Sequence, residues 1–388
     1  MRGNIKIARV QGIPIYVNVT WFLTLAFVTS VLALQVYPET FPLGSDLRDN
    51  YLVHWLMALG SGLVFFGSVL LHELAHSLVA KKNGIPVKGI TLFIFGGVAQ
   101  ITQDARRPRT EFIMAIVGPL TSLLLCAIFL GLWWLVGDFA EDKPLPAVLE
   151  WLGLMNFVVG VFNLVPGFPM DGGRVLRSAL WGITGSFRKA TRWAAWSGRA
   201  VGFGLIGLGG VIALGFFSFT HPWNGVWLAV VGFFLDSAAR QSWFQVQALD
   251  ALARYKAEEI MAEELSTAGS EERLADVLAR IQPGRRFTFF VKKDEQVVGV
   301  LTEKEVAKLT PIERDRATVE EVMLPRDEVA IAGPSDDGAT LLQNMDAADV
   351  WALPVVSKGQ VIGVVSRENL IRIVAARALG PRQRPEPT

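Results

Sequence analysis

The sequence predicts an α-helical multi-span membrane domain followed by a smaller soluble α/β domain. Hydrophobic residues make up 51% of the 388 residues and charged residues only 19%, and the mean hydropathy is +0.38. A soluble globular chain averages nearer a quarter charged residues, so this composition is typical of a membrane protein. Long apolar runs occupy residues 1–245, after which charge density rises and the segments shorten to the size of strands and short helices.

Six apolar segments of the first domain are long enough to span a membrane, which takes roughly 20 residues. They are residues 17–37, 51–80, 111–136, 147–176, 195–217 and 223–243. With six spans, the basic residues between them fall on one side and the acidic loops 38–50 and 137–146 on the other. Because basic loops stay in the cytosol, we expect a multi-pass protein of the cell membrane with both termini cytoplasmic. A cleavable signal peptide over 1–35 is the alternative, but no clear small-residue cleavage site follows.

Overall charge and cysteine content exclude several classes of site. The formal net charge is +1, which gives no indication of a nucleic-acid partner. Cys126 is the only cysteine, so one chain can hold neither a disulfide framework nor a cysteine-based metal site.

The stretch H-E-L-A-H, residues 72–76, places costly polar groups inside the second apolar segment. His72 and His76 are one helical turn apart, so both imidazoles project from one face and can share a zinc ion. Glu73 is close enough to take a proton from the attacking water without occupying a ligand position. This is the H-E-x-x-H arrangement of metalloproteases. The alternatives are a chance match and a proton-relay pair.

A catalytic zinc usually has three protein ligands, and the third candidate is Asp171. It lies in N-L-V-P-G-F-P-M-D-G-G-R, residues 163–174, where prolines and glycines break the fourth apolar segment near its end. Irregular backbone at membrane depth is tolerated only where it is buried in protein or lines a wet cavity. Asp171 is therefore expected at the depth of the two histidines, although it could instead cap a helix. For His54 and His221 we expect interfacial packing.

Three motifs in order closely resemble the site-2 protease family of intramembrane zinc metalloproteases. They are H-E-L-A-H, the pair Gly118-Pro119 in the next span, and N-x-x-P-x-x-P-x-D-G-G-R. The resemblance covers most of residues 50–180.

This resemblance implies one Zn²⁺ per chain and cleavage of a transmembrane helix of a membrane-protein substrate within the lipid bilayer. It assigns His72, His76 and Asp171 as zinc ligands and Glu73 as general base. Asn163 becomes a polar group near the scissile peptide, with a buried helix–helix hydrogen bond as its alternative role.

Residues 84–103 form an apolar run that is too short to span and is rich in β-branched and aromatic residues. We expect a membrane-associated β-hairpin directly after the active-site helix. Its edge could pair with an unwound substrate by β-augmentation, or the hairpin could be purely structural.

The second domain contains an internal repeat. E-E-I-M at 258–261 recurs as E-E-V-M at 320–323, and V-V-G-V-L-T-E-K-E-V at 297–306 recurs as V-I-G-V-V-S-R-E-N-L at 361–370. Duplication at this spacing indicates two copies of a small domain. The pattern resembles a pair of CBS domains, over 254–313 and 318–377, followed by a disordered tail at 378–388.

The CBS resemblance implies binding of ATP or another adenine nucleotide between the repeats and self-association into a homo-oligomer. Thr302 with Glu305, and Ser366 with Asn369, occupy the places where the family contacts phosphate and ribose. Both pairs depart from the usual Asp, and both hydroxyls could simply cap helices. Arg285 and Arg286 would add phosphate contacts or form a solvated basic turn.

The competing function is a CBS-regulated membrane transporter or channel that uses the histidines as a metal or proton relay. A transporter is expected to show paired broken helices or membrane repeats. The sequence has one broken segment, at 163–173.

Overall fold

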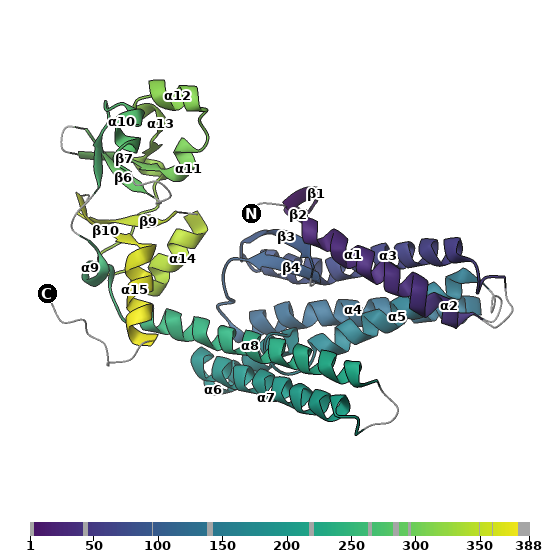
Figure 1. Cartoon of the computed structure of the whole chain (residues 1–388). Helices are drawn as coiled ribbons and strands as arrows, with labels where there is room; N and C mark the ends of the chain where they lie inside the picture. Colours follow the sequence, from purple (N-terminus) through teal and green to yellow (C-terminus); the bar gives the residue numbers. More distant parts are fainter. Residues whose placement is uncertain are drawn as a thin grey trace. The chain divides into compact units, whose positions relative to one another are not determined.

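The computed structural model divides into two compact units, residues 1–244 and 245–388, drawn in Figure 1. The structure describes residues 4–41, 46–94, 96–137, 143–216, 221–262, 266–281, 287–293, 296–348, 350–358 and 360–378. Arg285, Arg286, residues 379–388 of the predicted tail and parts of both acidic loops lie outside these ranges.

Five helical stretches in the described part of the chain are long and apolar enough to cross a membrane. They are α1, η1 and α2 together (Val19–Val31, Leu32–Val36, Tyr37–Thr40), α3 (Tyr51–Lys82), α4 (Pro108–Gly137), α5 (Pro144–Asn163) and α7 (Phe187–Ala213). The sixth predicted segment lies in α8 (Pro222–Leu252), which is helical and long but less apolar, with Asn224 near its start and Asp236 inside it. The helical membrane fold is therefore confirmed, with five clear spans.

A four-stranded sheet lies against α3, as Figure 1 shows. Its strands are β1 (Asn4–Val10), β2 (Ile13–Asn18), β3 (Val87–Phe93) and β4 (Gly96–Ile101), in the order β1-β2-β3-β4. β3 and β4 are the hairpin predicted from residues 84–103. The N-terminal hairpin, which adds β2 parallel to β3, is an element the sequence reasoning did not predict. Gln11 and Gly12 both have positive φ, as a tight two-residue hairpin turn requires.

The predicted break after α5 is confirmed: α5 ends at Asn163, and α6 (Asp171–Thr184) begins after a stretch of turns. Glycine is required in this segment by close packing. A Cβ on Gly172 would overlap the carbonyls of Leu164 and Val165, and one on Gly173 would overlap the backbone of Gly167. The prolines end α5, and the glycines let the chain fold back tightly enough for α6 to start with Asp171.

The second unit contains two copies of one helix–strand–helix–strand–strand–helix pattern. The first comprises α9 (Ala257–Ile260), β5 (Thr267–Gly269), α10 (Leu274–Leu278), β6 (Thr288–Lys293), β7 (Gln296–Thr302) and α11 (Glu303–Val306). After α12 (Pro311–Arg316), the second comprises α13 (Val319–Val322), a bridging residue at Ala332, α14 (Gly338–Ala348), β9 (Ala352–Ser357), β10 (Gln360–Ser366) and α15 (Arg367–Ala378). β8 (Leu324–Pro325) and the short helix η2 (Arg326–Glu328) follow α13.

The first helix of each copy packs into the core of the other. Ile260 of α9 is buried with Leu353 and Val365 of the second copy, while Val319 of α13 is buried with residues of the first. The methionine that follows each of these helices also contacts the other copy. Met261 lies over Gly363, and Met323 lies over Gly299, with sulfur 2.6 Å from where a Cβ would stand in each case. The glycine of each V-x-G-V repeat thus makes room for a methionine of the E-E-x-M repeat.

Candidate functional site

The candidate metal site starts from the face of α3 that carries His72 and His76. Both side chains are buried, at 4% and 5% exposed, although α3 is mainly apolar. Their i, i+4 spacing brings the two Nε2 atoms to 3.2 Å from each other.

Asp171 completes a triangle with the two imidazoles. Its Oδ2 lies 3.1 Å from Nε2 of His72 and 3.1 Å from Nε2 of His76, although the residues are 99 and 95 positions apart. Ligands held at about 2.0–2.1 Å in a tetrahedron around zinc stand about 3.3 Å apart, so the three atoms already have nearly the separation that one ion requires. The structure brings together the three residues that the sequence predicts as ligands.

Outer hydrogen bonds from α4 orient both imidazoles. Nδ1 of His76 lies 2.5 Å from the carbonyl oxygen of Met114, and a carbonyl can only accept, so Nδ1 donates and Nε2 keeps its lone pair for a metal. Nδ1 of His72 lies 2.9 Å from the buried hydroxyl of Ser122. Such second hydrogen bonds are typical of metal-ligating histidines because they fix the ring orientation.

Gly118 leaves the space that an ion would occupy. A Cβ at this position would overlap Nε2 of His76 and come within 2.7 Å of Nε2 of His72. The Gly-Pro motif of the sequence thus has a steric reason, because any larger residue would fill the cradle. The site also holds two carboxylates, those of Glu73 and Asp171, whose charge a divalent cation would offset in this buried setting. The residues present therefore fit zinc.

Glu73 lies next to the ligand triangle and is held by the sheet. Its Oε2 accepts a hydrogen bond of 3.0 Å from the backbone N–H of Ala99 in β4. Gly97 of the same strand lies over it, since a Cβ there would come within 2.6 Å of Cγ of Glu73. β4, one of the two edge strands of the sheet, is thereby bonded to the candidate base.

A buried ion pair ties the Asp171 helix to α4. Arg177 of α6, only 6% exposed, donates to the fully buried Glu111 near the start of α4 and to Asp104 at 3.2 Å. Helices α6 and α4 pack against each other in the membrane unit. Sequence reasoning counted Arg177 only as a loop charge, and nothing in its neighbourhood of the sequence pointed to a partner 66 positions away.

Asn163, His54 and His221, the other polar residues considered in the sequence, lie outside the ligand triangle. Asn163 is the last residue of α5 and half-buried, and its amide makes no hydrogen bond with the described part of the chain. His54 is fully buried and stacks on Phe41 with ring centroids 5.9 Å apart, as expected of a packing residue. His221 is exposed just before α8.

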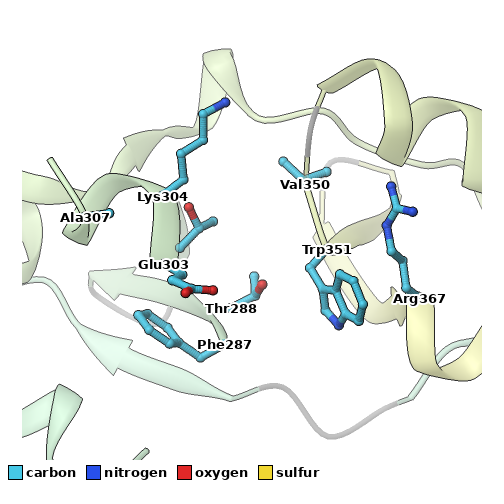
Figure 2. Close-up of a pocket in the computed structure, with 9 residues that line it drawn as sticks. Phe287, Thr288, Glu303, Lys304, Ala307, Val350, Trp351 and Arg367 are labelled. Carbon is cyan, nitrogen blue, oxygen red and sulfur yellow. The ribbon is translucent and has the colours of Figure 1, made fainter. Parts of the chain in front are cut away.

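A cavity of about 500 Å³ lies between the two repeats of the second unit. Figure 2 shows Phe287, Thr288, Glu303 and Lys304 of the first repeat on one side and Trp351 with Arg367 of the second on the other. The guanidinium of Arg367 lies 5.7 Å from the centre of the Trp351 ring. This size is typical of small-molecule sites.

Two pairs of lining residues are repeat equivalents, 64 positions apart: Phe287 with Trp351, and Glu303 with Arg367. The cavity therefore has aromatic walls from both repeats and opposite charges at equivalent places. Sequence reasoning did not select these residues, although the repeat alignment itself could have marked them.

Of the four residues predicted to contact nucleotide, only Thr302 lines the cavity. Its side chain makes no cap hydrogen bond to α11. Glu305 pairs with Lys308. Ser366 and Asn369 bond to each other at the start of α15, and the Asn369 backbone N–H donates to the Ser366 hydroxyl at 3.3 Å. This is the helix-capping arrangement considered as their alternative role.

Comparison with known proteins gives matches along the whole chain. The model of Peptidase family M50 matches residues 61–139 and 134–207, and the CBS domain model matches 319–376. Rip3 of Mycobacterium tuberculosis is 31% identical over 100% of this chain and 96% of its own length. The protein sll0528 of Synechocystis is 32% identical over 97% of each chain, and MJ0392 of Methanocaldococcus jannaschii is 26% identical over 97% of each.

The names of these three relatives describe zinc metalloproteases. Among solved structures, the site-2 protease from Methanocaldococcus jannaschii is 29% identical and covers 62% of this chain and 95% of its own, with a TM-score of 0.41. The M50 match contains His72, His76, Gly118 and Asp171. The chain therefore belongs to peptidase family M50, the site-2 protease family of zinc metalloproteases, and carries a C-terminal CBS domain.

Proposed function

We propose that this metalloprotease cleaves a transmembrane segment of a membrane-protein substrate at the site formed by His72, His76 and Asp171. The observation that carries the proposal is that Asp171 of α6 meets the two imidazoles of the spanning helix α3 at one point. His76 and His72 lie six and ten residues before the end of α3 at Lys82. At a rise of 1.5 Å per residue α3 is about 48 Å long, so a centred hydrocarbon region of about 30 Å begins about 9 Å from that end. The histidines, about 9–15 Å from the end, are expected at or inside this boundary.

The catalytic roles follow from the donor set and the hydrogen bonds. Zinc, when bound by the two imidazoles and the carboxylate, supplies a Lewis acid that acidifies water and polarises the scissile carbonyl. Glu73 accepts the proton of the attacking water and passes it to the leaving amine. Ser122 and the Met114 carbonyl hold the imidazoles in place while this happens. Asn163 would hydrogen-bond the substrate backbone or the developing oxyanion.

The sheet is suited to hold an unwound substrate beside Glu73. β4 is the outermost strand on that side, and its Ala99 N–H points away from β3 towards Glu73. An extended peptide added to this edge by β-augmentation would run past the candidate base. The substrate helix must unwind to do so, because peptide bonds in a helix are already hydrogen-bonded and shielded.

Membrane proteomics tests this proposal. Cells with the active chain and cells with Glu73→Gln should differ in a fragment cut within a transmembrane segment, present only with the active chain. Identical fragment patterns under conditions where both variants are expressed and hold zinc would overturn the proposal.

We further propose that the CBS pair regulates the protease by binding a nucleotide. The cavity offers an indole for a base to stack on and the cations of Lys304 and Arg367 for phosphates. The hydroxyls of Thr288 and Thr302 would serve as sugar contacts.

Calorimetric titration of the full chain with ATP and with AMP tests this regulation. Arg367→Gln should weaken binding, whereas Arg372→Gln, an exposed change on the same helix, should leave it intact. Equal affinities for both variants, or no heat of binding to the unaltered chain, would contradict the proposal.

The predicted topology has both termini in the cytosol, with the CBS pair as the self-association surface. Labelling of single cysteines introduced at each chain end, measured in sealed vesicles, reports whether the two ends share one side. Analytical ultracentrifugation in detergent reports the oligomeric state.

A further inference from the structure

Helix α7 presents two chemically different faces. Its protein-facing side is made of small buried residues, including Ala190, Ala194 and Gly198. Figure 1 shows α7 beside α6. Opposite them, Lys189, Arg192, Trp193 and Trp196 line a cavity of about 440 Å³. These four residues follow the spacing i, i+3, i+4, i+7, so they share one side of the helix. We call them the α7 basic–aromatic face.

Along the helix, the α7 basic–aromatic face changes from charged residues to exposed aromatic residues. Lys189 and Arg192 occupy the first turns, Trp193 and Trp196 are 66% and 53% exposed, and Phe203 follows two turns later at 51%. The 27 residues of α7 extend about 40 Å, which exceeds the hydrocarbon thickness of about 30 Å. The charged first turns therefore reach the headgroup region, and the exposed indoles stand where membrane proteins place interfacial tryptophan.

The positive charge of this face is not neutralised by the protein. Lys189 and Arg192 have no acidic partner in the described part of the chain, and no carboxylate is among the cavity-lining residues. The next basic residue, Arg199, differs because it pairs with Asp236 at 2.9 Å and stacks on Trp196 at 4.9 Å. Two free cations, two exposed indoles and a continuing apolar stripe match a phosphate group followed by an acyl chain.

We propose that the α7 basic–aromatic face binds the headgroup of an anionic phospholipid. Lys189 and Arg192 contact the phosphate, and the tryptophans pack along the glycerol and upper acyl chain. A soluble phosphate compound would satisfy the cations but leave the indoles and the stripe uncovered. This site is separate from the peptidase centre and does not depend on the proposed cleavage reaction.

Native mass spectrometry of the detergent-purified full chain, titrated with phosphatidylglycerol and separately with phosphatidylcholine, tests the proposal. Each basic residue near an anionic lipid contributes roughly fivefold to binding, so Lys189→Gln/Arg192→Gln should weaken phosphatidylglycerol binding roughly 30-fold. Arg106→Gln/Arg107→Gln removes the same charge from exposed residues just before α4 and serves as the matched control, which should change little. Zinc content checks that both variants are folded.

Three outcomes would overturn the proposal. The first is an equal loss in both double variants, which indicates general charge attraction. The second is equal retention of phosphatidylcholine and phosphatidylglycerol by the unaltered chain. The third is full displacement of the lipid by inorganic phosphate, which indicates a soluble anion as the occupant.

Discussion

Glu73 accepts a hydrogen bond from the backbone N–H of Ala99, 3.0 Å away, so the candidate base is bonded to the edge of the sheet. The same N–H is the group that an added β-strand would use for pairing. In the proposed mode of binding, a substrate strand would compete with Glu73 for this one donor, and its pairing would leave the carboxylate free to accept a proton from water.

Glu73→Gln should abolish cleavage without loss of zinc. The amide oxygen of glutamine still accepts from Ala99, so the local structure is kept, but the side chain cannot act as a base. General-base catalysis is worth roughly 100- to 10,000-fold, and the rate in proteoliposomes should fall by that range. Zinc content measured by mass spectrometry should stay at one per chain; a joint loss of zinc and activity would show that Glu73 is a structural residue.

Gly118→Ala should disrupt the metal site by steric overlap with His76. Displacing a ligand should lower zinc affinity by at least about 10-fold, the lower range seen when outer contacts of metal ligands are lost. Gly131→Ala lies in the same helix, with no atom within 4 Å of the new Cβ, and should retain zinc. Chelator competition on both variants measures the difference, and similar affinities would contradict the proposed cradle.

Arg177→Met should destabilise the membrane unit because it removes the close cation of the fully buried Glu111 and leaves only the more distant Arg174, 3.9 Å away. Removing one partner of a buried pair costs about 3–5 kcal/mol. Arg240→Met is the control: its side chain is 57% exposed, and Asp236 keeps Arg199 as a partner, so the expected cost is below about 1 kcal/mol. Unfolding in mixed micelles with SDS measures both, and adding Glu111→Gln to Arg177→Met should recover part of the loss.

Gly363→Ala should destabilise the second unit by overlap with Met261. Overpacking of this kind typically costs about 1–3 kcal/mol. Gly333→Ala introduces a Cβ no closer than 3.5 Å to its neighbours and should be nearly neutral. Pulse proteolysis of the full chain compares the two. If adding Met261→Ala to Gly363→Ala fails to relieve the strain, the exchange of first helices between repeats is not what requires glycine.

The proposed zinc ligands are predictable from sequence because polar residues are unexpected in the apolar segments that contain them. Imidazoles and carboxylates are costly in apolar segments, so His72, His76 and Asp171 stood out before any contact was known. The turns around Pro166 and Gly172 were predictable for a similar reason, since proline and glycine cannot continue a spanning helix.

Other features depend on contacts that leave no local signal. The N-terminal hairpin turns at Gln11-Gly12 rather than at the usual Asn-Gly, and it is recognisable only by its pairing with β3. In the sequence, Arg177 is indistinguishable from the other basic loop residues, because its partner Glu111 is 66 positions away. The exchange of α9 and α13 requires knowing that Met261 reaches the opposite repeat.

Zinc-edge X-ray absorption of the purified full chain tests the central claim most directly. It should show one zinc per chain with two imidazole nitrogens and a carboxylate oxygen at about 2.0–2.2 Å and no sulfur. In Asp171→Ala the oxygen contribution should change while the imidazole signal of any remaining zinc persists. A chain that holds no zinc, or a spectrum unaltered by Asp171→Ala, would contradict the proposed site.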